Sequence, residues 1–114
     1  MAKRNPPWTY EELVLALELY LRRGLVSPDD SELLELSDAL NQMGAAHAED
    51  PPKYRNPNGV HLKLANYRAR EHPGHGMSHG NHLEETVWNR FHGHRDLLVQ
   101  EAKRIRSAIA SKRR

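Results

Sequence analysis

The chain has 114 residues, of which 38% are hydrophobic and 28% are charged, and it contains no cysteine. This length suits one domain with a single core and leaves no room for a deep catalytic cleft, and the lack of cysteine excludes disulfides and thiolate zinc sites. No apolar run approaches the roughly 18 residues that a membrane span requires, and residues 1–7 lack the apolar stretch of a secretory signal. We therefore expect one cytoplasmic domain over residues 1–114, with no membrane partner.

Charge is distributed unevenly between the two halves of the chain. Residues 1–50 carry four Lys/Arg against ten Asp/Glu, a net charge of −6, whereas residues 51–114 carry thirteen against five, a net charge of +8. A basic half of this kind favours a polyanionic partner, with the acidic elements turned away from it. The alternative is that both halves are solvated surfaces and that the asymmetry is incidental.

The first predicted helix begins with a capping box, in which the Thr9 hydroxyl accepts from the amide of Glu12 and the Glu12 carboxylate reaches back. Trp8 and Leu13 are spaced as a hydrophobic staple, and Gly24 after two arginines is typical of a helix end. The buried stripe of this helix is expected to consist of Leu13, Leu17, Tyr20 and Leu21.

A second and a third helix are expected in the middle of the chain. Residues 27–31 combine proline with carboxylates in the manner of a helix start. A loop with three prolines then covers residues 44–58, and Asn58 is the expected cap of the third helix. The core face of the third helix, at positions i, i+4 and i+7, consists of Val60, Leu64 and Tyr67.

The last third of the chain predicts two more helices. Residues 71–81 hold too many glycines and prolines for regular structure, and the spacing of Asn81 and Glu84 indicates a capping box that opens the fourth helix. The inward side chains of the fourth and fifth helices are expected to be Val87, Trp88, Phe91, Leu98, Ala102, Ile105 and Ile109. No strand pattern occurs, so the sequence predicts an all-α fold, a compact orthogonal bundle of about five helices.

A basic cluster lies between residues 53 and 70, which hold five Lys/Arg and no acid. Arginine and lysine bind phosphate, and asparagine can form paired hydrogen bonds to an adenine edge, so this cluster predicts contact with double-stranded DNA. The alternative is a solvated helix face whose arginines pair with the acidic half. The candidate DNA-binding residues are Tyr54, Arg55, Asn56, Lys63, Asn66, Tyr67, Arg70 and His79.

A histidine cluster, formed by His72, His75, His79 and His82, lies in the glycine-rich loop. Imidazoles bind zinc, but the spacing matches no usual structural zinc pattern, so we predict no metal site and leave metal binding by this loop as an alternative. The sequence also lacks a nucleophile elbow and a phosphate-binding glycine motif after a strand. We therefore expect no enzymatic activity, no catalytic residue and no cofactor.

The segment from Arg55 to Tyr67 contains an Arg-Asn entry followed by Gly-Val, Lys-Leu and Asn-Tyr pairs. In this pattern the chain resembles the N-terminal region that precedes the nuclease in McrA-like, modification-dependent HNH restriction endonucleases of bacteria. The opening Trp8-Thr9 with its two glutamates and the late Trp88 are similar too, so the resemblance spans most of the chain.

The resemblance implies a module that recognises modified DNA, often DNA with 5-methylcytosine, for a C-terminal nuclease domain in the same parent chain. It is carried over to Arg55, Asn56, Lys63 and Asn66, which match the pattern, and replacing Arg55 and Lys63 with alanine is expected to weaken binding while the fold stays intact. The His-Asn-His signature of the nuclease is absent from this sequence. Binding without modification preference, recognition of phosphorothioate backbones, a protein-interaction module of a nuclease assembly, and a homodimer remain alternatives.

Overall fold

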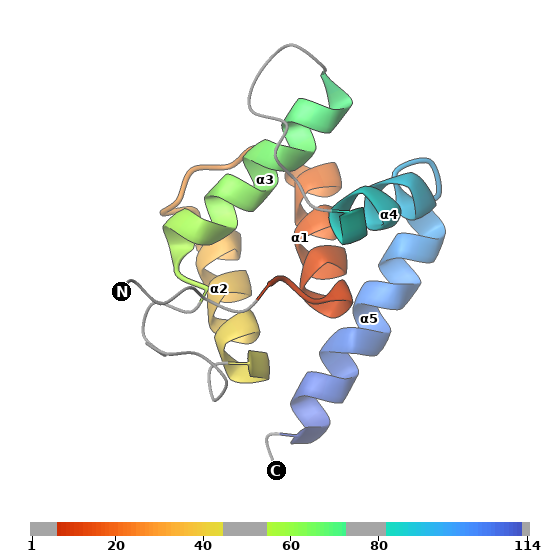
Figure 1. The fold of residues 1–114 in the computed structure, drawn as a ribbon. Coiled ribbons are helices and arrows are strands. Elements are labelled where there is room, and N and C mark those ends of the chain that lie inside the picture. Colours follow the sequence, from red (N-terminus) through yellow and green to blue (C-terminus); the bar gives the residue numbers. More distant parts are fainter. Residues whose placement is uncertain (1–6, 45–54, 73–81, 113–114) are drawn as a thin grey trace.

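The computed structural model describes residues 7–44, 55–72 and 82–112. These residues form the helices α1 (Tyr10–Arg23), α2 (Ser31–Gly44), α3 (Pro57–Glu71), α4 (His82–Phe91) and α5 (Arg95–Lys112), which pack into one bundle (Figure 1). No strand occurs within the described ranges. The predicted all-α bundle of about five helices is therefore confirmed, and none of its described helices is both long enough and apolar enough to cross a membrane.

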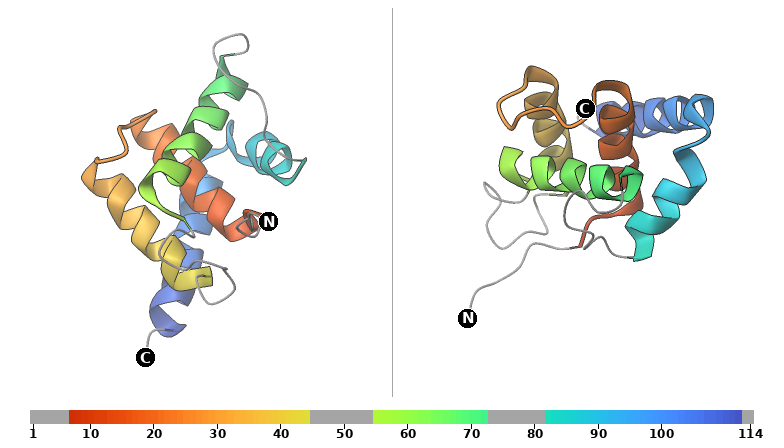
Figure 2. Two further views of the ribbon diagram at one scale, coloured as in Figure 1. Left: turned by 60° about the vertical axis from the view of Figure 1, so that its left-hand side comes forward. Right: turned by 90° about the horizontal axis from the view of Figure 1, so that it is seen from above.

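Helix α1 is the centre of the bundle, because it packs against each of the other four helices. All five side chains from Leu13 to Leu17 are completely buried, and Leu19 and Tyr20 are buried too. The two views of Figure 2 show α1 enclosed by the other helices. The predicted stripe was too narrow, since Val14, Leu15, Ala16 and Leu19 are buried besides its members, whereas its member Leu21 is only partly buried.

The capping signals fix where the helices begin. The capping box of α1 is formed, with the Glu12 amide donating to Thr9 Oγ1 at 3.2 Å and the Thr9 amide donating to Glu12 Oε1 at 2.9 Å. At the start of α3, however, the cap is Asn56, whose Oδ1 accepts from the Gly59 amide at 2.8 Å. The expected cap at Asn58 is wrong by two residues, because Pro57 has the fixed φ of a first helical residue and starts the helix earlier.

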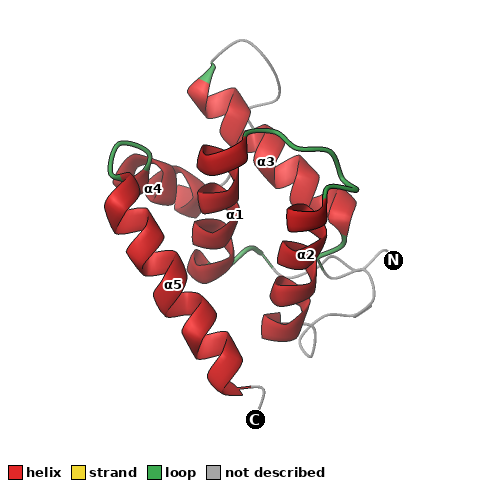
Figure 3. Ribbon diagram, turned by 180° about the vertical axis from the view of Figure 1, so that it is seen from behind, coloured by secondary structure: helices red, strands yellow, loops and turns green. Residues whose placement is uncertain are grey.

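Helices α3 and α5 lie on different sides of α1. Helix α3 packs across α1 and α2, whereas α5 runs along α1 and contacts α4, the order seen from behind in Figure 3. The predicted inward residues of α4 and α5 are buried, except that Ile109 is only partly buried against the core. One long face of α3 is thus left to the surface of the molecule, with Asn58, Leu62 and Arg68 exposed on it.

Candidate nucleic-acid interface

Arg55 is buried in an ion pair with Glu12, although it was expected to contact DNA. The arginine is 2% exposed and the glutamate 1% exposed. The guanidinium donates to both carboxylate oxygens, from Nε to Oε2 at 3.0 Å and from Nη2 to Oε1 at 2.9 Å. A side chain enclosed in this way cannot reach a duplex without opening the core, so the expectation of an exposed Arg55 is wrong.

The backbone of Arg55 is anchored as firmly as its side chain. Its carbonyl accepts from Ser37 Oγ at 2.6 Å, and its amide donates to Asn41 Oδ1 at 3.0 Å. Its Nη2 also donates to the Pro7 carbonyl at 3.2 Å. Arg55 therefore ties the segment before α3 to both α1 and α2, which is a structural role.

Asn56 also serves the fold, since the acceptor atom of its amide is used by the helix cap. Gly59 leaves room for this cap, since a Cβ at residue 59 would lie 3.3 Å from Asn56 Oδ1, a tight contact. The paired donor and acceptor contacts that were predicted between Asn56 and a base require that same oxygen. Its assignment as a base contact is therefore incompatible with the cap.

The polar face of α3 is held by one buried carboxylate, Glu84 of α4, which is 0% exposed. Glu84 Oε1 accepts from Lys63 Nζ at 2.7 Å and from Asn66 Nδ2 at 3.4 Å, and Oε2 accepts from Arg70 Nε at 2.7 Å. The Lys63 and Arg70 side chains remain 11% and 19% exposed. All three side chains belong to the predicted DNA contacts, and the sequence analysis missed the carboxylate that holds them.

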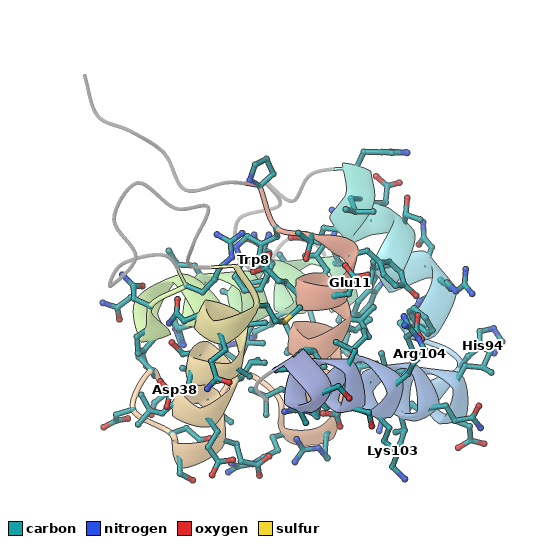
Figure 4. The ribbon with its side chains drawn as sticks, turned by 90° about the horizontal axis from the view of Figure 1, so that it is seen from below. Trp8, Glu11, Asp38, His94, Lys103 and Arg104 are labelled. Carbon is teal, nitrogen blue, oxygen red and sulfur yellow. The ribbon has the colours of Figure 1, made fainter. Side chains whose placement is uncertain are left out.

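Trp8 connects the Arg55 and Glu84 clusters. Arg55 Cζ lies 5.0 Å from the centroid of the indole ring, and Lys63 Nζ lies 5.3 Å from it, so two cations contact one aromatic ring. Figure 4 shows Trp8 where α1 begins, beside α3. The half-buried indole also packs against the core, as the predicted staple required.

Tyr67 is completely buried and cannot contact DNA as predicted. Its Oη donates to the Leu13 carbonyl at 2.9 Å, and its ring lies between those of Tyr20 and Trp88, at centroid distances of 6.3 and 6.0 Å. Burial raises the pKa of Tyr67 well above its ordinary value. The helical spacing that placed Tyr67 on the core face was the correct guide.

Two of the predicted DNA contacts, Tyr54 and His79, lie outside the described residues, as does His75 of the histidine cluster. Of that cluster, His72 and His82 are described, and both are exposed. His72 Nε2 lies 3.5 Å from Glu71 Oε1. Within the described ranges, no three His, Asp or Glu side chains are placed to hold a metal ion.

The outer face of α3 is defined here as the exposed Asn58, Leu62 and Arg68 together with the half-buried Ala65. Steps of four, three and three residues bring these side chains to the same side of the helix, where Ala69, four residues after Ala65, is 4% exposed and ends the open part of the surface. Leu62 is 61% exposed, and Arg68 forms no ion pair with a described carboxylate. The sequence reasoning missed Leu62, although a leucine outside the i, i+4, i+7 register of the core is a readable signal.

Helix α3 differs from the other helices in the charge of its first turn. Four of the helices have an acidic residue in the first turn, whereas α3 has none, so the positive end of its dipole is not offset there.

Comparisons with protein-family models, with curated proteins and with solved structures found no match for this chain.

Proposed function

We propose that the chain is a DNA-binding module that presents the outer face of α3 to a duplex and directs an HNH-type nuclease of its parent protein to modified DNA, with 5-methylcytosine as the modification. The observation that carries the proposal is the chemistry of α3. Helix α3 contains three Lys/Arg, its one acid is its last residue, Glu71, and the side chains of Asn58, Leu62 and Arg68 on its outer face are exposed. The resemblance of residues 55–67 to McrA-like modules supports the choice of a modified duplex.

The buried ion pairs have a supporting role in this proposal. Glu84 fixes Lys63 and Arg70 along the edge of α3, so the side chains of this edge are ordered before a ligand arrives. Ordering a long cationic side chain during binding costs conformational entropy, and a group that is already held avoids most of that cost. We therefore assign phosphate contact to the exposed Arg68, and we assign to Lys63 and Arg70 a fixed positive potential beside it.

A salt titration of DNA affinity tests the proposal. Binding of a short duplex, followed by fluorescence anisotropy, should weaken steeply between about 50 and 200 mM salt, because phosphate contacts release counterions. Arg68→Ala should lower the slope of log K against log salt by about 1, the loss of one phosphate contact. Absence of binding even at low salt would rule out the proposed function.

Lys103→Ala is the matched control. It removes the same charge from an exposed side chain of α5, which points away from Trp8 in Figure 4. Its salt slope should equal that of the unchanged protein. Equal losses from Arg68→Ala and Lys103→Ala would indicate attraction by net charge alone, and would overturn the assignment of α3.

The choice of modification needs four otherwise identical duplexes: unmodified, cytosine-methylated, adenine-methylated and phosphorothioated. We expect the cytosine-methylated duplex to bind tightest. Equal affinity for all four would reduce the function to general DNA binding, and a preference for the phosphorothioate would replace the methyl group by the backbone as the feature recognised.

A further inference from the structure

Leu62 is an exposed apolar side chain that the fold does not need. At 61% exposure it is the most exposed large apolar residue of the described part, ahead of Leu97 at 53%. Val60, Leu64 and Tyr67 on the opposite side of α3 are all at 0% exposure and supply the packing of this helix. Burial in the core therefore does not explain a leucine at position 62.

The side chains around Leu62 suit the floor of a DNA groove. One turn earlier lies the exposed Asn58, and one turn later lies the half-buried Asn66, so amide groups flank the apolar side chain along the helix. Arg68 lies six residues after Leu62, which is about 9 Å along the helix axis at the rise of an α-helix. A helix fits the major groove, which is about 12 Å wide, and basic side chains beyond its base-contacting residues then lie near the phosphates.

We propose that Leu62 is the specificity-determining residue of this surface and that it contacts the C5 methyl group of a modified cytosine in the major groove. This inference rests on the proposed function. A C5 methyl group adds apolar surface to the groove and leaves every hydrogen-bonding group of the base pair in place. An exposed leucine gains from such a group by burying it, whereas the flanking amides do not.

The same reasoning separates cytosine methylation from adenine methylation. Adenine is recognised through its N7 acceptor and its N6 amino donors, the pair that an asparagine contacts. A methyl group on N6 replaces one of these donors. The favourable burial of that methyl group is then partly offset by the hydrogen bond that Asn58 or Asn66 can no longer accept. The outer face of α3 should therefore favour a C5-methylated cytosine over an N6-methylated adenine.

The test compares the unchanged protein with Leu62→Ala on duplexes that differ in one cytosine, which is unmodified, methylated or hydroxymethylated. Burial of one methyl group corresponds to a gain of about fourfold in affinity. The unchanged protein should show this gain for the methylated duplex and little gain for the hydroxymethylated one, whose hydroxyl would face leucine without a partner. Leu62→Ala should bind all three duplexes equally, with the salt slope of the unchanged protein.

Leu97→Ala, a second exposed leucine on α5, is the control and should keep the fourfold preference. If neither protein binds DNA, the proposed function fails. If the unchanged protein prefers methylcytosine and Leu62→Ala keeps that preference, the function stands and the role of Leu62 is overturned. Retention of the preference together with loss of self-association in Leu62→Ala would instead assign the leucine to an interface between copies of the chain.

Discussion

Within the described residues two carboxylates, Glu12 and Glu84, are buried, and they are used differently. Glu12 pairs with one arginine, Arg55, and both side chains are enclosed at 1% and 2% exposure. Glu84 is equally enclosed, yet its partners Lys63 and Arg70 lead outward to the surface at 11% and 19% exposure. The first pair closes the core, whereas the second orders cations at the edge of a surface helix.

The difference shows that a count of basic residues in a segment does not locate a positive surface. Four cations of the cluster between residues 53 and 70 are described, Arg55, Lys63, Arg68 and Arg70, and of these four only Arg68 is exposed without a described acidic partner. The charge of a buried cation such as Arg55 is neutralised by the carboxylate to which it donates, so its electrostatic potential at the surface is small. Its loss should damage the fold first and binding only as a consequence.

The largest effect should come from Arg55→Ala. The substitution leaves Glu12 buried without its guanidinium, and breaking a buried pair by removing one partner costs about 3–5 kcal/mol. We expect the free energy of unfolding in urea to fall by this amount. This replaces the expectation from the sequence that alanine at position 55 leaves the fold intact. Arg22→Ala, which removes the surface pairs of this arginine with Glu18 and Glu32, should cost only about 1 kcal/mol. A loss at Arg55 no larger than at Arg22 would contradict a core role.

Glu84→Gln should have an intermediate effect. The amide cannot satisfy both Lys63 and Arg70, but these side chains are close enough to the surface to recover hydration. We expect a loss of about 2 kcal/mol in the free energy of unfolding, in the range of hydrogen bonds to charged groups. Hydrogen exchange of the first turn of α4 should accelerate more than that of α1. Equal loss for Glu84→Gln and Arg55→Ala would remove the distinction between the two carboxylates.

A smaller effect is expected from Tyr10→Phe, at the contact between α1 and α5. Tyr10 Oη donates to Glu101 Oε2 at 2.5 Å, and burial together with this bond raises the pKa of Tyr10 to about 12. The hydroxyl is only partly enclosed, so we expect a loss of about 1 kcal/mol in urea unfolding. An unchanged midpoint of urea unfolding would mean that water replaces the hydrogen bond between Tyr10 and Glu101 without loss of stability.

The smallest effect should be a pH dependence at Glu101. Hydrogen bonds from Arg104 and Tyr10 lower the pKa of Glu101 to about 2, from 4.5. Its ionised form therefore stabilises the folded state fully above pH 4.5, and this contribution is lost as the pH falls toward 2. The difference in unfolding free energy between the unchanged protein and Glu101→Gln should shrink over that window, and it should stay below about 1 kcal/mol because Arg104 is largely exposed. A difference in unfolding free energy that does not change with pH would contradict the lowered pKa of Glu101.

Local signals in the sequence predicted the helices well. Thr9 with Glu12 fixed the start of α1, and the i, i+4, i+7 spacing of α3 placed Val60, Leu64 and Tyr67 in the core. The cap of α3 was misplaced because Asn56 and Asn58 are both good caps, and only the proline between them favours the earlier one. Capping and periodicity act over a few residues, so one sequence contains the information they need.

The partners of the cations could not be predicted in the same way. Arg55 and Glu12 are 43 residues apart, and Glu84 is 21 residues from Lys63. Nothing in the spacing of a single sequence states which of fifteen acids meets which of seventeen cations, because the folded topology decides it. Exposure was therefore assigned by residue type, which failed for Arg55 and overlooked Leu62.

The central position of α1 has a consequence for how the chain can be divided. Every other helix buries its apolar side against this one segment, so removing residues 10–23 would leave four helices without a common partner. No smaller piece that lacks it should fold, because its side chains form the middle of the shared core. Truncations intended to isolate the α3 surface must therefore keep the N-terminal helix.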